Sequence, residues 1–347
     1  MWRTIGQLKA LALLEHSLRM NNLAHAYLFV GPAHVGKTTL AVDLAQAVNC
    51  QGAASPCGEC QSCRRIANGR HADVAIIGLN SARGLTETKP RVEISIEDIR
   101  ALQRSASLPP YEGKCKVFII DGAEYLSSEA ANCLLKTLEE PLPKVIILLL
   151  TAEESRLLPT VVSRCQRVEL KPMSSGEIEK VLIESQGVND DRARLLARLS
   201  QGCFGWALTA SVDDNYLAQR AQRLSEMFSL FSAGWEERFA YAGQLGSGRK
   251  PAEEIIKLWV VWWRDVMLTK CECKQVIINV DYTLVLEEWA QALDLQEIKD
   301  FSNSLRRSLS QISRNANLQL VFETLMLDMP RKEGKRGLAI SPMPTAL

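Results

Sequence analysis

The sequence predicts an α/β nucleotide-binding domain, with a parallel sheet between two layers of helices, followed by regions that are entirely helical. Three observations support this prediction. Short apolar runs typical of buried parallel strands alternate with helical patterns as far as about residue 171. A phosphate-binding loop, Gly31-Pro-Ala-His-Val-Gly36-Lys37-Thr38, follows the first apolar run. Beyond residue 172 only helical spacing remains.

The phosphate-binding loop stands between a strand pattern at residues 26–30 and a helix pattern at residues 38–48. This is the context that the motif requires, so a chance match is the weaker interpretation. Backbone N–H groups of such a loop surround phosphate, its lysine reaches the β- and γ-phosphates, and the next hydroxyl ligates Mg²⁺. We therefore expect Mg²⁺-ATP at Gly31, Gly36, Lys37, Thr38 and Thr39.

A four-cysteine array follows the loop helix, at Cys50, Cys57, Cys60 and Cys63. Four thiolates without histidine predict a closed, tetrahedral, structural Zn²⁺ site, inserted as a knuckle into the first domain. An iron–sulfur cluster, disulfides or free thiols are the alternatives. The opening Met1-Trp-Arg-Thr-Ile-Gly is not a signal peptide, so we expect a cytoplasmic protein with reduced thiols.

Composition limits the classes of function. A chain of 347 residues suggests two or three domains. Its formal net charge is only +1, so we expect contact with nucleic acid to be local or made through partner proteins. No apolar run approaches the length that spans a membrane, which argues against a membrane partner.

The first domain continues with alternating strand and helix patterns. Asp121 ends one apolar run, where a carboxylate would face Mg²⁺, and Thr151 ends another, where such sheets place ligand contacts. A polar loop with Gly84 and Pro90 is expected at residues 80–93, and Ser127 is expected to cap a helix. Further strands are expected at residues 74–77, 117–120, 145–150 and 167–170, and helices at 96–102, 130–138 and 157–163.

The second half of the sequence has only helical patterns. Helices are expected from Ser175 and over residues 189–199. Apolar stripes at residues 255–266 and 305–312 predict further helices. The cluster Trp259–Trp263 has helical spacing with mixed charges beside it, which favours a core or a subunit interface over base stacking. The basic piece at residues 331–336 is interpreted as a solvated end.

Several longer strings are highly specific. They are Ile5-Gly6-Gln7, Ala131-Asn-Cys-Leu-Leu-Lys-Thr-Leu-Glu-Glu-Pro141, Leu158-Pro-Thr-Val-Val-Ser-Arg-Cys165 and Asn315-Ala-Asn-Leu-Gln-Leu-Val-Phe-Glu-Thr-Leu325. Together with the loop and the cysteines, they resemble bacterial DNA polymerase III clamp-loader subunits of the AAA+ class. The resemblance is dense over residues 1–175 and thinner afterwards. It implies an AAA+ domain at 1–171, a helical lid at 172–212, and at 213–347 a helical collar for oligomerisation with a short flexible tail.

Two subunit types of this family fit, and departures from the motif separate them. In the ATP-hydrolysing motor (gamma/tau) type, the residue after the strand-ending aspartate is a glutamate that polarises the attacking water; here it is Gly122. Glu124 lies two positions on and is expected to point elsewhere. The lid arginine of the motor type is replaced by Gly205. The resemblance therefore favours the delta-prime type, with intrinsic ATPase activity weak or absent, and the motor type is the alternative.

The string Ser163-Arg164-Cys165 remains intact. The resemblance implies that Arg164 is an arginine finger that reaches in trans into the ATP site of a neighbouring subunit; a surface ion pair is the alternative. It also implies a hetero-pentamer with motor and delta subunits that loads the sliding clamp on primer–template DNA, within the DNA polymerase III holoenzyme and without a polymerase site of its own. A small-molecule P-loop kinase and a zinc DNA-binding protein are the candidates from other classes; the expected lid and collar disfavour the first, and the near-neutral charge the second.

Overall fold

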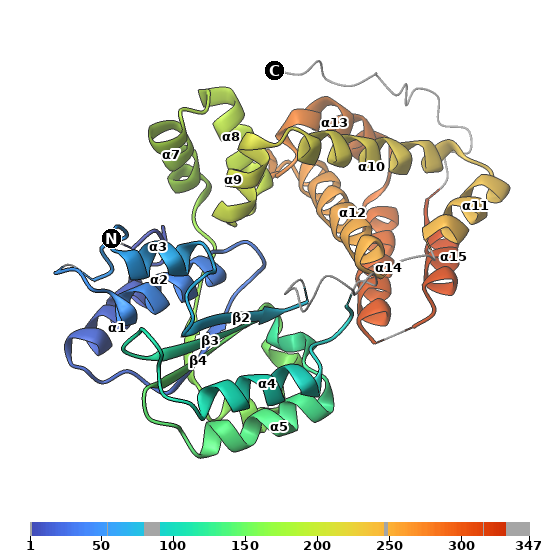
Figure 1. Ribbon diagram of the computed structural model, residues 1–347. Coiled ribbons are helices and arrows are strands. Elements are labelled where there is room, and N and C mark those ends of the chain that lie inside the picture. Colours follow the sequence, from blue (N-terminus) through green and yellow to red (C-terminus); the bar gives the residue numbers. More distant parts are fainter. Residues whose placement is uncertain (1, 54, 80–90, 246–248, 315, 331–347) are drawn as a thin grey trace. The chain divides into compact units, whose positions relative to one another are not determined.

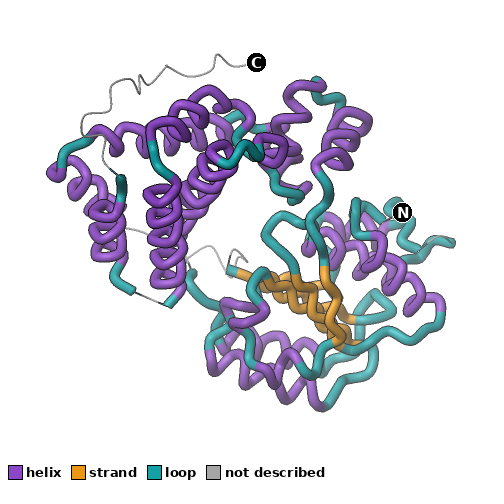
Figure 2. Tube along the Cα trace, turned by 180° about the vertical axis from the view of Figure 1, so that it is seen from behind, coloured by secondary structure: helices purple, strands orange, loops and turns teal. Residues whose placement is uncertain are grey.

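The computed structural model describes residues 2–53, 55–79, 91–245, 249–314 and 316–330. Five strands lie together, and helices make up most of the remainder (Figures 1 and 2). The strands are β1 (Ala26–Val30), β2 (Val74–Gly78), β3 (Lys116–Asp121), β4 (Val145–Thr151) and β5 (Gln166–Glu169). The helices of the sheet region are α1 (Leu8–Arg19), α2 (Lys37–Asn49), α3 (Gln61–Ala67), α4 (Ile96–Ala106), α5 (Ser128–Glu139) and α6 (Pro159–Val162).

The later helices are α7 (Ser175–Gln186), α8 (Asp190–Leu199), α9 (Phe204–Val212), α10 (Asn215–Ser232), α11 (Trp235–Leu245), α12 (Arg249–Lys270), α13 (Thr283–Ala292), α14 (Leu295–Ser313) and α15 (Leu318–Asp328). Packing divides the chain into two compact units. One contains residues 1–178 and 202–206, and the other contains 179–201 and the described residues from 207 onward. None of the described helices combines the length and apolar character needed to cross a membrane.

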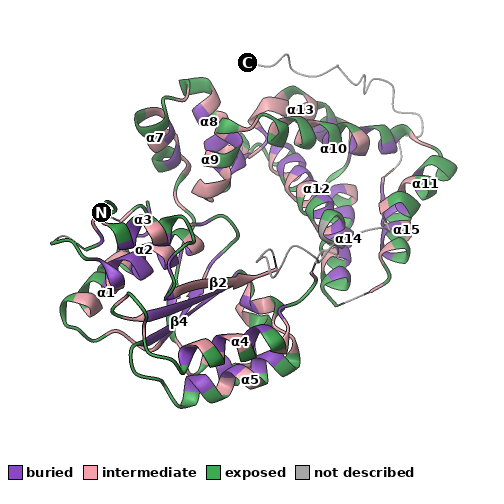
Figure 3. Cartoon of the chain, viewed as in Figure 1, coloured by how far each residue is buried: buried purple, intermediate pink, exposed green. Residues whose placement is uncertain are grey.

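The five strands form one parallel sheet in the order β2-β3-β4-β1-β5. The predicted parallel sheet and each of its predicted strands are confirmed. The last strand lies one residue earlier than expected, at 166–169, because Gln166 already pairs with Tyr27 while Leu170 has left the ladder. The central strand β4 is buried along its length and the edge strand β2 is only half-buried (Figure 3).

Alternate residues of the strands face two separate layers of helices, which confirms the predicted layering (Figure 1). On one face, Phe29 and Leu148 pack with helices α1, α2 and α3. On the other, Leu28 and Ile147 pack with α4, α5 and α6. The predicted cap is present, because Ser127 Oγ accepts a hydrogen bond from the backbone N–H of Ala130 at 3.1 Å. The sheet is therefore held rigidly between helices, with its strands' carboxyl ends on one edge.

The predicted helix at 157–163 is shorter than expected. A 3₁₀ turn covers Glu154–Arg156, and α6 begins only at Pro159. Proline favours the first position of a helix, since it has no N–H to leave unpaired there. Most of the predicted loop at 80–93, and the basic piece at 331–336, lie outside the described residues.

The later helices pack around an aromatic core. The side chains of Trp259, Trp262 and Trp263 are fully buried, and Trp263 packs against Phe301 with 4.7 Å between ring centroids. Buried rings cannot stack on nucleic acid bases, so the interpretation of this cluster as core is confirmed. The apolar stripes of α12 and α14 meet in the same core.

Candidate functional site

The phosphate-binding loop connects β1 to α2. Gly36 precedes the helix with φ +107°, a conformation that residues with a Cβ rarely adopt, so glycine is required there. A Cβ on Gly31 would lie 2.6 Å from the carbonyl oxygen of Leu170. Lys37 Nζ donates hydrogen bonds to the carbonyl oxygens of Gly31 at 2.6 Å and Pro32 at 2.8 Å. The lysine is thus folded back over the loop that would hold phosphate.

The other predicted nucleotide-binding residues lie in or around this loop. Thr38 Oγ1 donates a hydrogen bond to Asp121 Oδ2 at 3.2 Å, so the hydroxyl and carboxylate that would share Mg²⁺ face each other. Thr151 is fully buried and pairs in register with Val30, the last residue of β1. Thr39 lies in the first turn of α2. The structure therefore brings the predicted loop, Asp121 and Thr151 to one edge of the sheet.

Glu124 differs from expectation. We expected its side chain to point away, yet its Oε1 accepts a hydrogen bond at 3.1 Å from the backbone N–H of Ala152, the residue after β4. Burial lowers the pKa of the Lys37 ammonium, while the charges of Glu124 and then Asp121 oppose this change. The expectation rested on the position of Glu124 relative to Asp121, and position in the sequence does not show the left-handed turn at Gly122.

The start of α9, which the resemblance assigns to a lid, contacts the phosphate-binding loop directly. The backbone N–H of Gly205, in the first turn of α9, donates a hydrogen bond to the carbonyl oxygen of His34 at 2.9 Å. A Cβ on Gly205 would approach that oxygen to 2.8 Å. Glycine at the motor arginine's position therefore allows backbone-to-backbone contact between this helix and the loop.

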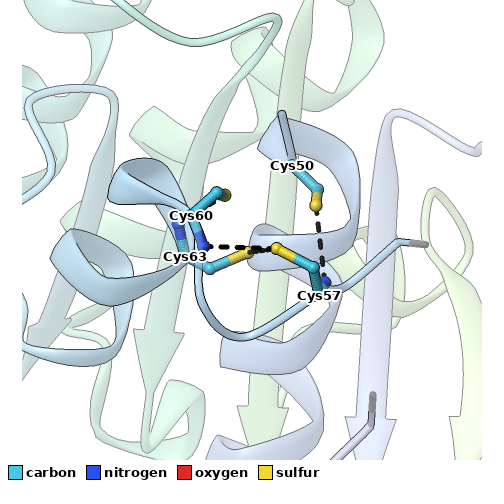
Figure 4. A group of neighbouring side chains, drawn as sticks. All are labelled: Cys50, Cys57, Cys60 and Cys63. Atoms are coloured by element: carbon cyan, nitrogen blue, oxygen red, sulfur yellow. Dashed lines mark hydrogen bonds between the residues drawn. The ribbon is translucent and has the colours of Figure 1, made fainter. Parts of the chain in front are cut away.

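The four cysteines of the array converge (Figure 4). Their Sγ atoms all lie within 4.8 Å of one another, and Cys57 Sγ lies 3.9 Å from Cys63 Sγ. Four thiolates around a tetrahedral Zn²⁺ are separated by about 3.8 Å, given zinc–sulfur bonds of about 2.3 Å. Cys50 and Cys63 are buried, and Cys57 and Cys60 are half-buried. The group could hold a metal ion, and its donor set fits zinc.

Backbone N–H groups point at the sulfur atoms. Cys50 Sγ accepts from the N–H of Cys57, Cys57 Sγ from that of Cys60, and Cys60 Sγ from that of Cys63, at 3.3–3.4 Å. Hydrogen bonds to sulfur favour the thiolate. The N–H of Cys60 accordingly lowers the pKa of Cys57. For Cys60, burial acts in the opposite direction, but hydrogen bonds from Gln51 and Cys63 outweigh it and the pKa falls to about 6.

Neighbouring elements hold the knuckle by its backbone. Gln46 of α2 donates from Nε2 to the carbonyl oxygen of Cys63 at 2.8 Å, and Lys114 Nζ donates to that of Cys50 at 2.7 Å. Ser62 Oγ lies 3.1 Å from Nε2 of buried His71, which precedes β2. The four-cysteine knuckle is thus joined to both the loop helix and the sheet.

Arg164 follows α6 on the surface, with its side chain 35% exposed. Its Nη2 lies 2.6 Å from Glu139 Oε1, and its Nη1 donates to the carbonyl oxygen of Thr160 at 2.9 Å. Glu139 is the last residue of α5 and belongs to the Leu-Leu-Lys-Thr-Leu-Glu-Glu string, but its pairing with Arg164 was not predicted. Arg164 is therefore half-buried and forms an ion pair near the surface, which was the alternative to a finger; its action in trans stays a prediction.

Comparisons with known proteins agree on one family. The sequence model described as DNA polymerase III, delta subunit, matches residues 6–174. The DNA polymerase III subunit delta' of Bacillus subtilis is 29% identical over 340 residues, which covers 94% of this chain and 97% of that protein. The DNA polymerase III subunit gamma of Buchnera aphidicola is 34% identical over 351 residues, covering 97% and 90%.

The DNA polymerase III subunit tau of Escherichia coli is 38% identical over 212 residues, covering 59% of this chain and 31% of that protein. The five-stranded parallel sheet with its phosphate-binding loop is the AAA+ arrangement expected from the sequence. The chain therefore belongs to the DNA polymerase III clamp-loader family, which contains the delta-prime and gamma/tau subunits.

Proposed function

We propose that this chain is the delta-prime-type stator of a replicative clamp loader and supplies Arg164 to the ATP site of a neighbouring subunit. The observation that carries this proposal is the contrast between two positions of one family pattern. Gly122 stands where the motor type needs its water-polarising glutamate, while Arg164 is present and partly exposed. Such a chain can complete another subunit's site, because an arginine finger stabilises charge on the transferred phosphoryl group.

We infer that the chain also binds Mg²⁺-ATP in its own loop. Backbone N–H groups between Gly31 and Gly36 would surround the phosphates, and Lys37 would leave its carbonyl partners to reach them. Thr38 and Asp121 would hold Mg²⁺, which neutralises phosphate charge when bound. Thr39 and Thr151 would complete the pocket at the end of the loop helix and of β4. The hydrogen bond between Thr38 and Asp121 supports this assignment.

We infer that the metal is Zn²⁺ in a structural role, held by Cys50, Cys57, Cys60 and Cys63. All four positions of a tetrahedral site would be filled by thiolates, which leaves no open position for chemistry. The convergence of the sulfur atoms supports the assignment. Zinc would fix the loop between α2 and α3 without touching the nucleotide.

The proposed partners are the motor and delta subunits in a hetero-pentamer, together with the sliding clamp. This chain would contact primer–template DNA mainly through the other subunits of the complex, since its own net charge is nearly zero. The proposed division is an AAA+ domain at 1–171, a lid at 172–212 and a collar at 213–347. A cytoplasmic location follows from this role.

A gamma/tau-type motor is the second candidate, and the similarity to the gamma subunit of Buchnera aphidicola over nearly the whole chain favours it. Reconstitution separates the two. Motor and delta subunits are mixed with and without this chain, and assembly, DNA-stimulated ATPase activity and clamp loading are measured. The stator proposal expects that clamp loading is lost when this chain is omitted. It also expects that the Lys37→Ala variant, whose own loop is inactivated, still supports clamp loading. Loss of stimulated ATPase activity in that variant, equal to omission of the chain, would favour the motor.

A further inference from the structure

The loop after β3 takes an unusual route. Gly122 has φ +82° and ψ +51°, and a Cβ there would lie 2.8 Å from Tyr125 Cδ2. Two backbone hydrogen bonds fix the turn, from the N–H of Gly122 to the carbonyl oxygen of Leu150 and from the N–H of Tyr125 to that of Gly122. A third, from the N–H of Ile94 to the carbonyl oxygen of Tyr125 at 2.7 Å, joins the loop to the start of α4. Glycine therefore permits a sharp, well-held turn.

This turn brings the side chain of Glu124 back to the edge of the sheet. Its Oε1 is held by the N–H of Ala152, next to Thr151. Its Oε2 is buried and has no hydrogen-bond partner among the residues that the structure describes. Burying a carboxylate oxygen without a partner is unfavourable, so its retention points to a partner that arrives with the ligand.

A role as a plain counter-ion for Lys37 explains this geometry less well. In the described part of the chain, Lys37 Nζ forms no ion pair and instead contacts the carbonyl oxygens of Gly31 and Pro32. Asp121 is already engaged by Thr38. The attraction between Glu124 and the ammonium of Lys37 places the carboxylate in the same site without a direct contact. Oε2 of Glu124 is thus an acceptor that none of the described residues uses.

We propose that Glu124 replaces the glutamate missing at position 122 and orients the attacking water in this chain's own nucleotide site. The water oxygen forms a bond to the γ-phosphorus of ATP while the bond from that phosphorus to the β,γ-bridging oxygen breaks. The bond's electron pair leaves with ADP, the water proton passes to the Glu124 carboxylate, and phosphate and that proton are then released. This rests on the nucleotide site proposed above but not on the stator role of Arg164.

The test compares full-length wild type with Glu124→Gln, which keeps the shape of the side chain. Glu129→Gln, which changes an exposed glutamate in the first turn of α5, is the matched control. Single-turnover hydrolysis of radiolabelled Mg²⁺-ATP is measured, with Lys37→Ala as the blank. Slow turnover above the blank is expected from wild type and the control, with a loss of roughly a hundredfold in Glu124→Gln.

Calorimetric affinity for Mg²⁺ and a non-hydrolysable ATP analogue is the second readout, and it should change less than about twofold in Glu124→Gln. Turnover of Glu124→Gln equal to wild type, or wild-type turnover equal to the blank, overturns the proposal. A tenfold or larger change in affinity also overturns it, because it assigns Glu124 to ground-state binding. Clamp loading by the reconstituted complex reports separately on the stator role, and Glu124→Gln should leave it intact.

Discussion

The guanidinium of Arg164 is held by the carboxylate of Glu139, with 2.6 Å between Nη2 and Oε1. Both side chains are at least one-third exposed, so the pair contributes little to folding stability. It does fix the direction of the guanidinium, together with the carbonyl oxygen of Thr160. An exposed arginine with a defined orientation suits a group that must meet a neighbouring molecule.

Replacement of Arg164 by alanine should therefore leave the chain folded and able to assemble, but should impair the reconstituted complex. Fingers contribute on the order of a thousandfold in related phosphoryl transfers, although only one of several ATP sites is affected directly. Arg164→Lys should rescue only in part, since an ammonium lacks the planar fork. The measurements are DNA- and clamp-stimulated ATPase activity and clamp loading.

Arg156→Ala is the control for that variant, because Arg156 is an exposed arginine nearby that pairs with Glu153 at 2.8 Å. It should load clamps at the wild-type rate. If Arg164→Ala complexes also load clamps at that rate across ATP concentrations, Arg164 is a surface ion pair and no finger.

The four-cysteine array should bind one Zn²⁺ per chain. Elemental analysis of protein purified without added metal, with thiol titration before and after chelation, measures this. Cys57→Ser should lose zinc and loosen the knuckle, yet leave the sheet folded, because the strands pack independently of the cysteines. Cys271→Ser, which changes an exposed cysteine outside the array, should keep full zinc content. If wild-type protein contains no zinc and all four thiols titrate freely, the four cysteines are not a zinc site.

An arginine at position 205, as in the motor type, should disrupt the contact between α9 and the phosphate-binding loop and should not activate the chain. A Cβ at Gly205 approaches the carbonyl oxygen of His34 to 2.8 Å, and backbone cannot move aside easily. Gly205→Arg and Gly205→Ala should each lower the free energy of unfolding by about 1–3 kcal/mol, measured by urea denaturation. Gly176→Ala is the matched control, because a Cβ there meets open space in α7. Equal stability of the Gly205 variants and the control would contradict this contact.

Acid stability should depend on Asp73. This buried carboxylate accepts hydrogen bonds from the N–H groups of Tyr111, Glu112 and Gly113 at 2.7–2.8 Å. Burial alone would raise its pKa, but these bonds outweigh burial and lower the pKa below its ordinary value of 3.8. Its contribution to stability is therefore present above about pH 4 and is lost as the pH falls through the lowered folded-state pKa.

Asp73→Asn should consequently cost about 1–3 kcal/mol at neutral pH and should flatten the fall in stability below pH 4. Denaturation midpoints between pH 3 and pH 7 measure both effects. Asp190→Asn, at an exposed position at the start of α8, should leave the profile nearly unchanged. If Asp73→Asn keeps the wild-type dependence of stability on pH, groups other than Asp73 cause the loss of stability in acid.

Much of the first unit was predictable because its signals are local. The apolar runs at 26–30 and 145–150 form strands, as predicted. A strand that is buried on both faces is apolar at nearly every position, so a short apolar run is enough to identify it. The spacing of Cys57, Cys60 and Cys63 also follows from local chain geometry. Ser127 capped the expected helix for the same reason. In these segments, each residue's neighbours along the chain suffice to determine its structure.

Other features depend on contacts between distant segments. The direction of Glu124 followed from a left-handed glycine and from the N–H of Ala152, 28 residues away, so counting positions from Asp121 gave the wrong direction. Glu139 meets Arg164, and Gly205 meets His34, only because separate elements pack together. Short-range patterns encode the strands, the phosphate-binding loop and the cysteine array, so these features could be predicted from the sequence alone. The hydrogen bond of Glu124 to Ala152 and the ion pair of Glu139 with Arg164 could not, because backbone turns and long-range packing bring these groups together.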